Sequence, residues 1–198
     1  RVLFRSLGNR PNPVAIPLAI ETLQRADPTL TSAAARVIGE VAAAGLLHPD
    51  DRIVIRELLP ELDQLTDRDT ARTKVLIADE DGLKAARGLL RSDNEAVRRG
   101  AAEGFRKRGL RDVLREEASD PTVRRVTIQT WIDSPPAIGL VNLEVLQELR
   151  PLGDTEQARS DFSTWQGAVV QALAALPVDR LADAERILRD EPSLLDAR

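Results

Sequence analysis

Apolar and small residues recur along the chain at intervals of three and four, as they do on the buried face of a helix. No segment alternates apolar and polar residues as a half-buried strand does, so the pattern predicts an all-α protein. Small residues in mid-stripe predict that a neighbouring helix approaches closely. The three clearest stripes are Leu30, Ala34, Val37, Ile38 and Val41; then Val97, Gly100, Ala101, Gly104 and Phe105; then Val123, Val126, Thr127 and Trp131.

Turn signals separate the predicted helices. Ser92 with Glu95 predicts a capping box, and Gly45 and Gly109 are expected to end the helices that precede them. An Asx residue before a Pro is expected to cap a helix whose first position is the Pro. This Asx-Pro pair occurs at Asn12-Pro13, Asp27-Pro28 and Asp120-Pro121.

Each stripe follows another amphipathic segment, so the repeating unit is a helix, a tight turn and a helix. The segments "LLRSDNEAVRRGAAEGFRKRG" and "LGNRPNPVAIPLAIETLQRADPTLTSAAARVIGEV" resemble HEAT repeats. The resemblance covers residues 7–134 and fades after the double Pro of "DSPPAIG". It implies a right-handed α-solenoid of HEAT-like helix pairs, with residues 135–198 as divergent helical repeats or a C-terminal cap.

The first six residues, Arg1–Ser6, do not fit this pattern. They can be written CGT GTG CTC TTC CGA TCT, which resembles the end of a common sequencing adapter, and the chain contains no Met. We therefore expect residues 1–6 to be a non-native leader on a fragment of a larger bacterial protein, truncated at both ends. A solenoid cut in this way is expected to expose an apolar N-terminal end.

The composition narrows the possible chemistry. There is no Cys, which excludes disulfides and thiolate sites, and the apolar runs are too short for a membrane helix or a signal peptide. His48 is the only His and reads as a surface turn residue, while the acids of Asp79–Asp81 suit the start of a helix. We expect a cytoplasmic protein with no cofactor, no bound metal and no catalytic activity. Trp131 and Trp165 lie on apolar stripes and are expected to pack in the core.

Basic residues concentrate between Lys84 and Arg125. This segment has 12 basic and seven acidic residues, a net charge of +5 in a chain whose net charge is −4. The arginines could pair structurally with helix caps and carbonyl groups, or they could form a stripe that binds a polyanion. The candidate surface residues are Arg98, Arg99, Arg106, Lys107, Arg124 and Arg125.

The HEAT-like resemblance implies a scaffold that binds a protein partner, not yet identified, on the surface formed by the second helices. The first alternative is a nucleic-acid-binding repeat similar to HEAT-like DNA-alkylation-repair proteins, which would use the Arg98–Arg125 stripe. A HEAT-like lyase subunit of phycobilisome type is a further alternative. The sequence offers one His, no Cys and no suitable acid pair for such an enzyme.

Overall fold

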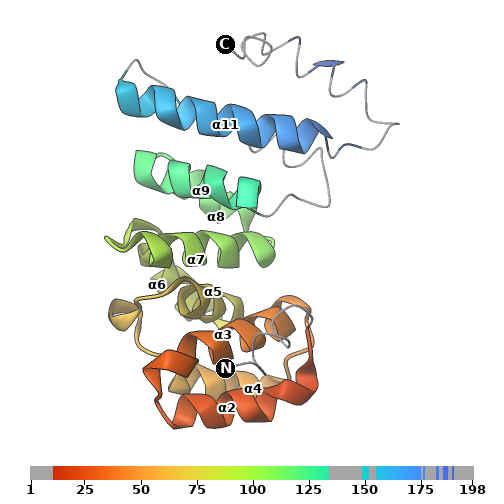
Figure 1. Ribbon diagram of the computed structural model, residues 1–198, viewed down its shortest axis with the longest axis vertical. Helices are drawn as coiled ribbons and strands as arrows, with labels where there is room; N and C mark the ends of the chain where they lie inside the picture. Colours follow the sequence, from red (N-terminus) through yellow and green to blue (C-terminus); the bar gives the residue numbers. More distant parts are fainter. Residues whose placement is uncertain are drawn as a thin grey trace. The chain divides into compact units, whose positions relative to one another are not determined.

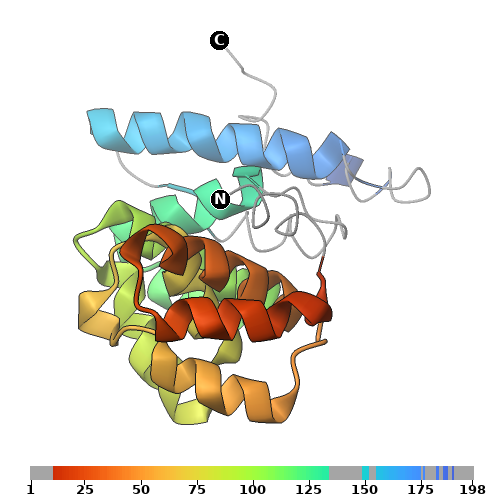
Figure 2. The same cartoon turned by 60° about the horizontal axis from the view of Figure 1, so that its bottom comes forward.

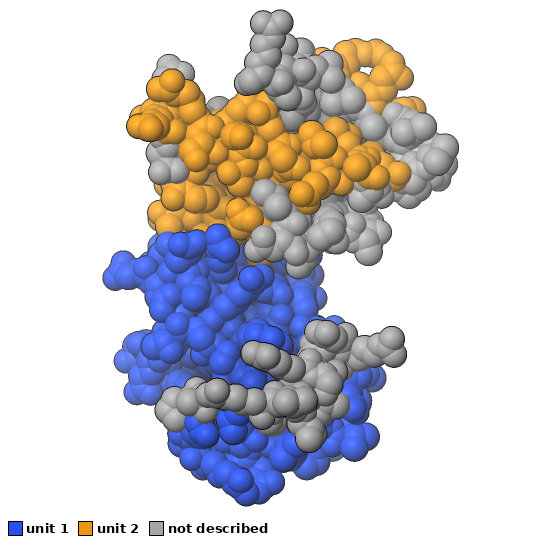
Figure 3. Space-filling model, in the orientation of Figure 1, with its two compact units in different colours: residues 1–114 blue, residues 115–198 orange. Residues whose placement is uncertain are grey.

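The computed structural model describes residues 11–133, 149–151, 155–174, 176, 182, 185, 186 and 189. Every regular element in these ranges is a helix and none is a strand, which confirms the all-α prediction. The predicted leader 1–6 and the double Pro of the "DSPPAIG" break lie outside them. The chain divides into two compact units, residues 1–114 and 115–198, and each is described by itself (Figure 3).

In unit 1 three helices, α3, α5 and α7, pack in succession, and because each directly follows a shorter helix in the chain we call them the second helices. Helix α3 contacts α5, and α5 contacts α7, while α2 packs against both α3 and α4 (Figures 1 and 2). The α-helices are α2 (Ile16–Gln24), α3 (Pro28–Ala43), α4 (Pro49–Leu58), α5 (Arg68–Ile77), α6 (Glu80–Ala86), α7 (Glu95–Lys107) and α8 (Arg111–Glu117), which ends in unit 2. Short 3-10 helices are η1 (Pro13–Ala15), η2 (Leu62–Gln64) and η3 (Arg87–Arg91).

Asx side chains cap helix starts as the sequence predicts. The Asn12 carboxamide oxygen accepts a hydrogen bond from the Val14 N–H at 3.2 Å, and an Asp120 carboxylate oxygen accepts one from Thr122 at 2.7 Å. Helix α3 begins at Pro28, directly after Asp27.

The predicted capping box of Ser92 and Glu95 is wrong. Asn94 is the N-cap of α7, and its side chain accepts a hydrogen bond from the Ala96 N–H at 2.9 Å. The helix therefore begins two residues later than predicted, and Glu95 occupies its first position instead of its third. The Ser92 hydroxyl accepts a hydrogen bond from the Asn94 N–H instead, at 3.3 Å.

Gly45 and Gly109 end α3 and α7, as predicted. Their φ angles are 71° and 77°, in the left-handed region that costs a glycine little. After each glycine the chain closes the helix with an N–H from the next residue. Leu46 donates to the Val41 carbonyl at 3.0 Å, and Leu110 donates to the Phe105 carbonyl at 2.9 Å. This is the hydrogen-bond pattern of a Schellman motif.

Glycines also allow the second helices to approach one another closely. A Cβ atom at Gly100 in α7 would lie 2.2 Å from the Arg68 carbonyl oxygen of α5, and one at Gly104 would lie 2.7 Å from the Val75 Cβ. On the other side of α5, a Cβ at Gly39 would lie 2.6 Å from the Thr73 hydroxyl. The mid-stripe small residues of α7 thus act as the sequence predicts.

Unit 2 contains α9 (Pro121–Asp133) and α11 (Glu156–Ala174), which pack together. Trp165 is fully buried in their core beside Ile128, and its ring centroid lies 5.3 Å from that of Phe162. The predicted core position of Trp165 is confirmed, while the Trp131 side chain lies outside the described part of the structure. Among the helices described in both units, none is long and apolar enough to cross a bilayer.

Candidate interaction surface

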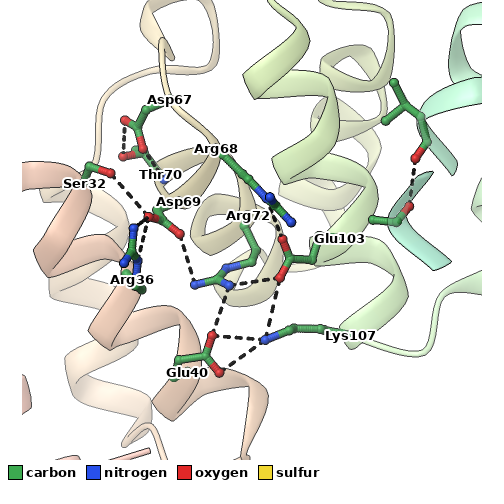
Figure 4. Close-up of polar contacts among 12 residues, drawn as sticks. Ser32, Arg36, Glu40, Asp67, Arg68, Asp69, Thr70, Arg72, Glu103 and Lys107 are labelled. Atoms are coloured by element: carbon green, nitrogen blue, oxygen red, sulfur yellow. Dashed lines mark hydrogen bonds and ion pairs between the residues drawn. The ribbon is translucent and has the colours of Figure 1, made fainter. Parts of the chain in front are cut away.

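The most extensive polar arrangement in unit 1 joins the three second helices (Figure 4). Charged side chains from α3, α5 and α7 alternate in sign along this row, which we call the charge ladder. Each of the three helices contributes at least one acid and one base. The members of the charge ladder are Arg36, Glu40, Arg68, Asp69, Arg72, Glu103 and Lys107.

Arg72 is the centre of the charge ladder. Its side chain is only 7% exposed, and its Nη1 atom lies 3.0 Å from a carboxylate oxygen of Glu40 and 3.0 Å from one of Glu103. Its Nη2 atom lies 3.4 Å from Asp69 on the same helix. A single buried guanidinium in α5 is therefore shared by carboxylates from both neighbouring helices.

The outer members of the ladder are cations. Arg36 donates from Nε and Nη2 to Asp69 at 2.8 and 2.6 Å, and Arg68 donates from Nε to Glu103 at 3.0 Å. The Lys107 ammonium lies 3.1 and 3.2 Å from the two carboxylate oxygens of Glu40. These contacts are charge-assisted hydrogen bonds of ordinary length, and each of them joins side chains from two different helices.

The electrostatics of Glu103 reflect this arrangement. Its burial acts to raise the pKa of the carboxyl, but Arg72, Arg68 and Lys107 together outweigh burial and hold that pKa below its ordinary value. Asp69 raises the pKa of Arg36 through its hydrogen bonds and its charge. Both shifts favour the ionised forms, a carboxylate at Glu103 and a guanidinium at Arg36.

Arg98 and Arg124, each the fourth residue of its helix, make the same contact. Arg98 donates from its guanidinium to the Ser92 carbonyl, and Arg124 donates from Nε to the Ala118 carbonyl at 3.0 Å. In both cases the carbonyl precedes the arginine by six residues. Each arginine thus ties the start of a second helix to the connection before it.

The other members of the predicted stripe have acidic partners or lie beside the charge ladder. Arg99 pairs with Glu95 at 3.0 Å within α7, and Arg125 pairs with Asp161 of α11 at 2.7 Å. Lys107 is itself a rung of the ladder. Burial lowers the pKa of Arg106; the charge of Glu103 acts to raise it, and the charges of Arg111 and Arg68 act to lower it. The stripe's first four residues belong to unit 1, and Arg124 and Arg125 belong to unit 2.

His48 and Asp79 both cap helices. The exposed His48 side chain accepts a hydrogen bond from the Asp50 N–H at 3.3 Å at the start of α4, and Asp79 accepts one from the Gly82 N–H at 2.9 Å at the start of α6. This hydrogen bond, followed by Arg56, lowers the pKa of Asp79 against the opposing effect of burial. Throughout the described ranges, no three His, Cys, Asp or Glu side chains gather as a metal site requires.

A second surface feature of unit 1 is apolar. Five of the six large aliphatic side chains that are exposed among the described residues lie between positions 14 and 54. They belong to η1, α2, α4 and the loop after α3, where the sequence predicts an apolar end. These five side chains are Val14, Leu18, Leu46, Ile53 and Val54.

The charge ladder is not predicted by the sequence pattern. Its local signals were the pairs Asp69/Arg72 and Glu103/Lys107, which are three and four residues apart within predicted helices. Such pairs usually lie on a solvated helix face, and nothing in the local pattern distinguishes a buried pair from an exposed one.

Comparison of the chain with protein-family models, curated proteins and solved structures gives no match.

Proposed function

We propose that the chain is a protein-binding scaffold built as a right-handed α-solenoid of HEAT-like helix pairs. The contacts of α3 with α5 and of α5 with α7 support this arrangement, since successive second helices stack in a solenoid. The charge ladder is the observation that carries the functional proposal. It places partly exposed charged groups on three consecutive second helices and holds them in fixed positions.

The ladder suits a binding surface better than a purely stabilising role. A buried ion pair contributes little net stability compared with a well-packed apolar core, but it can fix the register of the helices that share it. Charged groups held in place at a surface guide the encounter with a partner and select among partners. In this proposal Arg72 and Glu103 fix the register, while Arg36 and Arg68 meet the partner.

Site-specific photo-crosslinking tests this proposal. A photoreactive residue at Ala43 lies on the stripe of Arg36 and Glu40 and is exposed, whereas one at Glu57 is an exposed control on α4. We expect a discrete protein adduct in cells from position 43 and none from position 57. The adduct should disappear in Arg36→Glu/Arg68→Glu. Equal crosslinking from both positions, or an adduct that survives the charge reversal, would contradict the proposal.

The second candidate function is binding of nucleic acid or another polyanion by the Arg98–Arg125 stripe. The net charge of +5 in residues 84–125 favours it. To bind phosphate, Arg99 and Arg125 would first have to release their present carboxylate partners, Glu95 and Asp161. Binding of a DNA oligonucleotide that weakens with salt and is lost in Arg98→Glu/Arg124→Glu would support this function. Absence of binding at low salt would reject it.

A further inference from the structure

The two most exposed side chains of the charge ladder are bases, while its other two bases, Arg72 and Lys107, are 7% and 24% exposed. The side chains of Arg36 and Arg68 are 52% and 40% exposed, whereas those of Glu40, Asp69 and Glu103 are 24%, 12% and 5% exposed. Its four bases also outnumber its three acids. A molecule that approaches this face therefore meets guanidinium groups before it meets carboxylates.

The carboxylates are already occupied. One Asp69 oxygen accepts two N–H groups from Arg36, and both Glu40 oxygens lie within 3.2 Å of Lys107. Glu103 accepts from Arg68 with one oxygen and from Arg72 with the other. A basic ligand would have to displace these internal partners. At Arg36 a carboxylate ligand would not have to displace Asp69, because Asp69 engages only two of the five N–H donors of that exposed guanidinium.

We propose that the charge ladder binds an acidic segment of a partner protein, with carboxylates of that segment paired to Arg36 and Arg68. This inference rests on the proposed protein-binding function and specifies the chemistry of the partner. Arginine is suited to the role because its planar guanidinium pairs with a carboxylate through two parallel hydrogen bonds.

The two arginines also set a spacing. Arg36 lies on α3 and Arg68 on α5, and packed helices have axes about 8–10 Å apart. A segment in the polyproline II conformation advances about 3.1 Å per residue with three residues per turn, so acids three residues apart lie about 9 Å apart on one side of it and can meet both arginines. We therefore expect the partner to contain acidic residues at an interval of about three.

A cluster of cations beside Arg68 strengthens the case. Burial lowers the pKa of the partly buried Arg106; Glu103 opposes this effect, and the charges of Arg111 and Arg68 add to it. A carboxylate bound at Arg68 would offset this repulsion.

Nucleic acid fits the same surface less well. The ladder has three carboxylates of its own, and the whole chain has a net charge of −4, so a densely charged phosphate backbone meets repulsion at close range and at long range. A short acidic peptide places its charges only where the arginines lie.

Fluorescence anisotropy with the full chain tests the inference. The probe is a labelled (Glu-Ser-Gly)4 peptide, which has an acid at every third residue, and its controls are (Gln-Ser-Gly)4 and a single-stranded oligo-dT. The variant Arg36→Gln/Arg68→Gln removes the two proposed contacts. The matched control Arg25→Gln/Lys84→Gln removes the same charge from residues outside the ladder, whose side chains are 73% and 69% exposed.

We expect the Glu peptide to bind, the Gln peptide to fail, and the ladder variant to weaken binding by about tenfold or more. The control variant should change affinity less than about twofold, as expected for screened surface charges. Arg36→Lys/Arg68→Lys keeps both positive charges and their ion pairs, so it tests the arginine geometry even if the Gln variant unfolds. It should weaken binding by a factor between those of the control variant and the Gln variant. Equal loss in the control, unchanged affinity in the Lys variant, or tighter binding of oligo-dT than of the peptide would overturn the inference.

The outcome also separates this inference from the function on which it rests. If the Glu peptide fails to bind while the crosslink from position 43 remains specific, the surface binds a partner of different chemistry. If both experiments fail, the proposed function fails as well.

Discussion

The close approach of α5 and α7 gives a quantitative test of the fold at Gly100. In Gly100→Ala the new Cβ would lie 2.2 Å from the Arg68 carbonyl oxygen, whereas an ordinary carbon–oxygen contact is about 3.3 Å or longer. The obstructing atoms are backbone, so the two helices must separate by about 1 Å. Overpacking of this kind costs about 1–3 kcal/mol, and the higher helix propensity of Ala returns about 1 kcal/mol. Taking the upper end of that cost, we expect a net loss of about 2 kcal/mol in the free energy of unfolding.

Urea denaturation followed by far-UV circular dichroism measures this loss. The tryptophans, Trp131 and Trp165, belong to unit 2, so their fluorescence does not report directly on unit 1. A loss of about 2 kcal/mol should lower the urea midpoint by about 1 M. The matched control is Gly88→Ala, where a Cβ would meet nothing within 4 Å, and its midpoint should stay the same or rise slightly. If Gly100→Ala is as stable as this control, α5 and α7 do not meet as described.

Three further predictions concern the polar contacts. Arg72→Met leaves the buried Glu103 carboxylate without its central partner and should lower the free energy of unfolding, measured by urea denaturation, by about 3–5 kcal/mol. Adding Glu103→Leu should restore part of this loss. If the losses of the two single variants simply add in the double variant, the pairing is contradicted. The pKa of Glu103 is lower in the folded chain than its unfolded value of about 4.3. Its ion pairs therefore stabilise the fold above the unfolded pKa, and this stabilisation is lost as the pH falls through the folded pKa. Glu103→Gln should accordingly reduce the fall in stability on the acid side of a stability–pH curve. Arg98→Ala removes the hydrogen bond to the Ser92 carbonyl and should cost about 1 kcal/mol, against about 0.5 kcal/mol or less for Arg99→Ala; thermal melts that rank them in the opposite order would refute this role of Arg98.

Local signals in the sequence predicted the fold elements well where one residue type decides the outcome. Gly45 and Gly109 end their helices because few other residues adopt a positive φ at low cost. Asn12 and Asp120 cap helix starts because a short side-chain acceptor reaches the free N–H groups. The start of α7 was misplaced because Ser92, Asp93 and Asn94 are all capable caps in succession, and their competition is settled by where the helix packs.

The charge ladder could not be predicted in this way. Its contacts between helices join residues that are 31 to 67 positions apart in the chain, such as Arg72 with Glu103 and Lys107 with Glu40. The sequence shows that Arg72 lies in a helix, but only packing against both neighbours buries its side chain. The predicted basic stripe contained Lys107 and Arg125 without their acidic partners on other helices, Glu40 and Asp161. The count of charges along this segment therefore does not show which of them are paired.

The shared guanidinium of Arg72 makes the three second helices non-interchangeable. Helix α5 supplies a cation to acids on both sides, so a duplicated α5 would place one Arg72 against another, and an exchange of helices would separate the acids from their cation. Gain or loss of a helix pair at this point would require compensating changes in the adjacent pairs. Helices α3, α5 and α7 are consequently constrained to evolve together, in a fixed order.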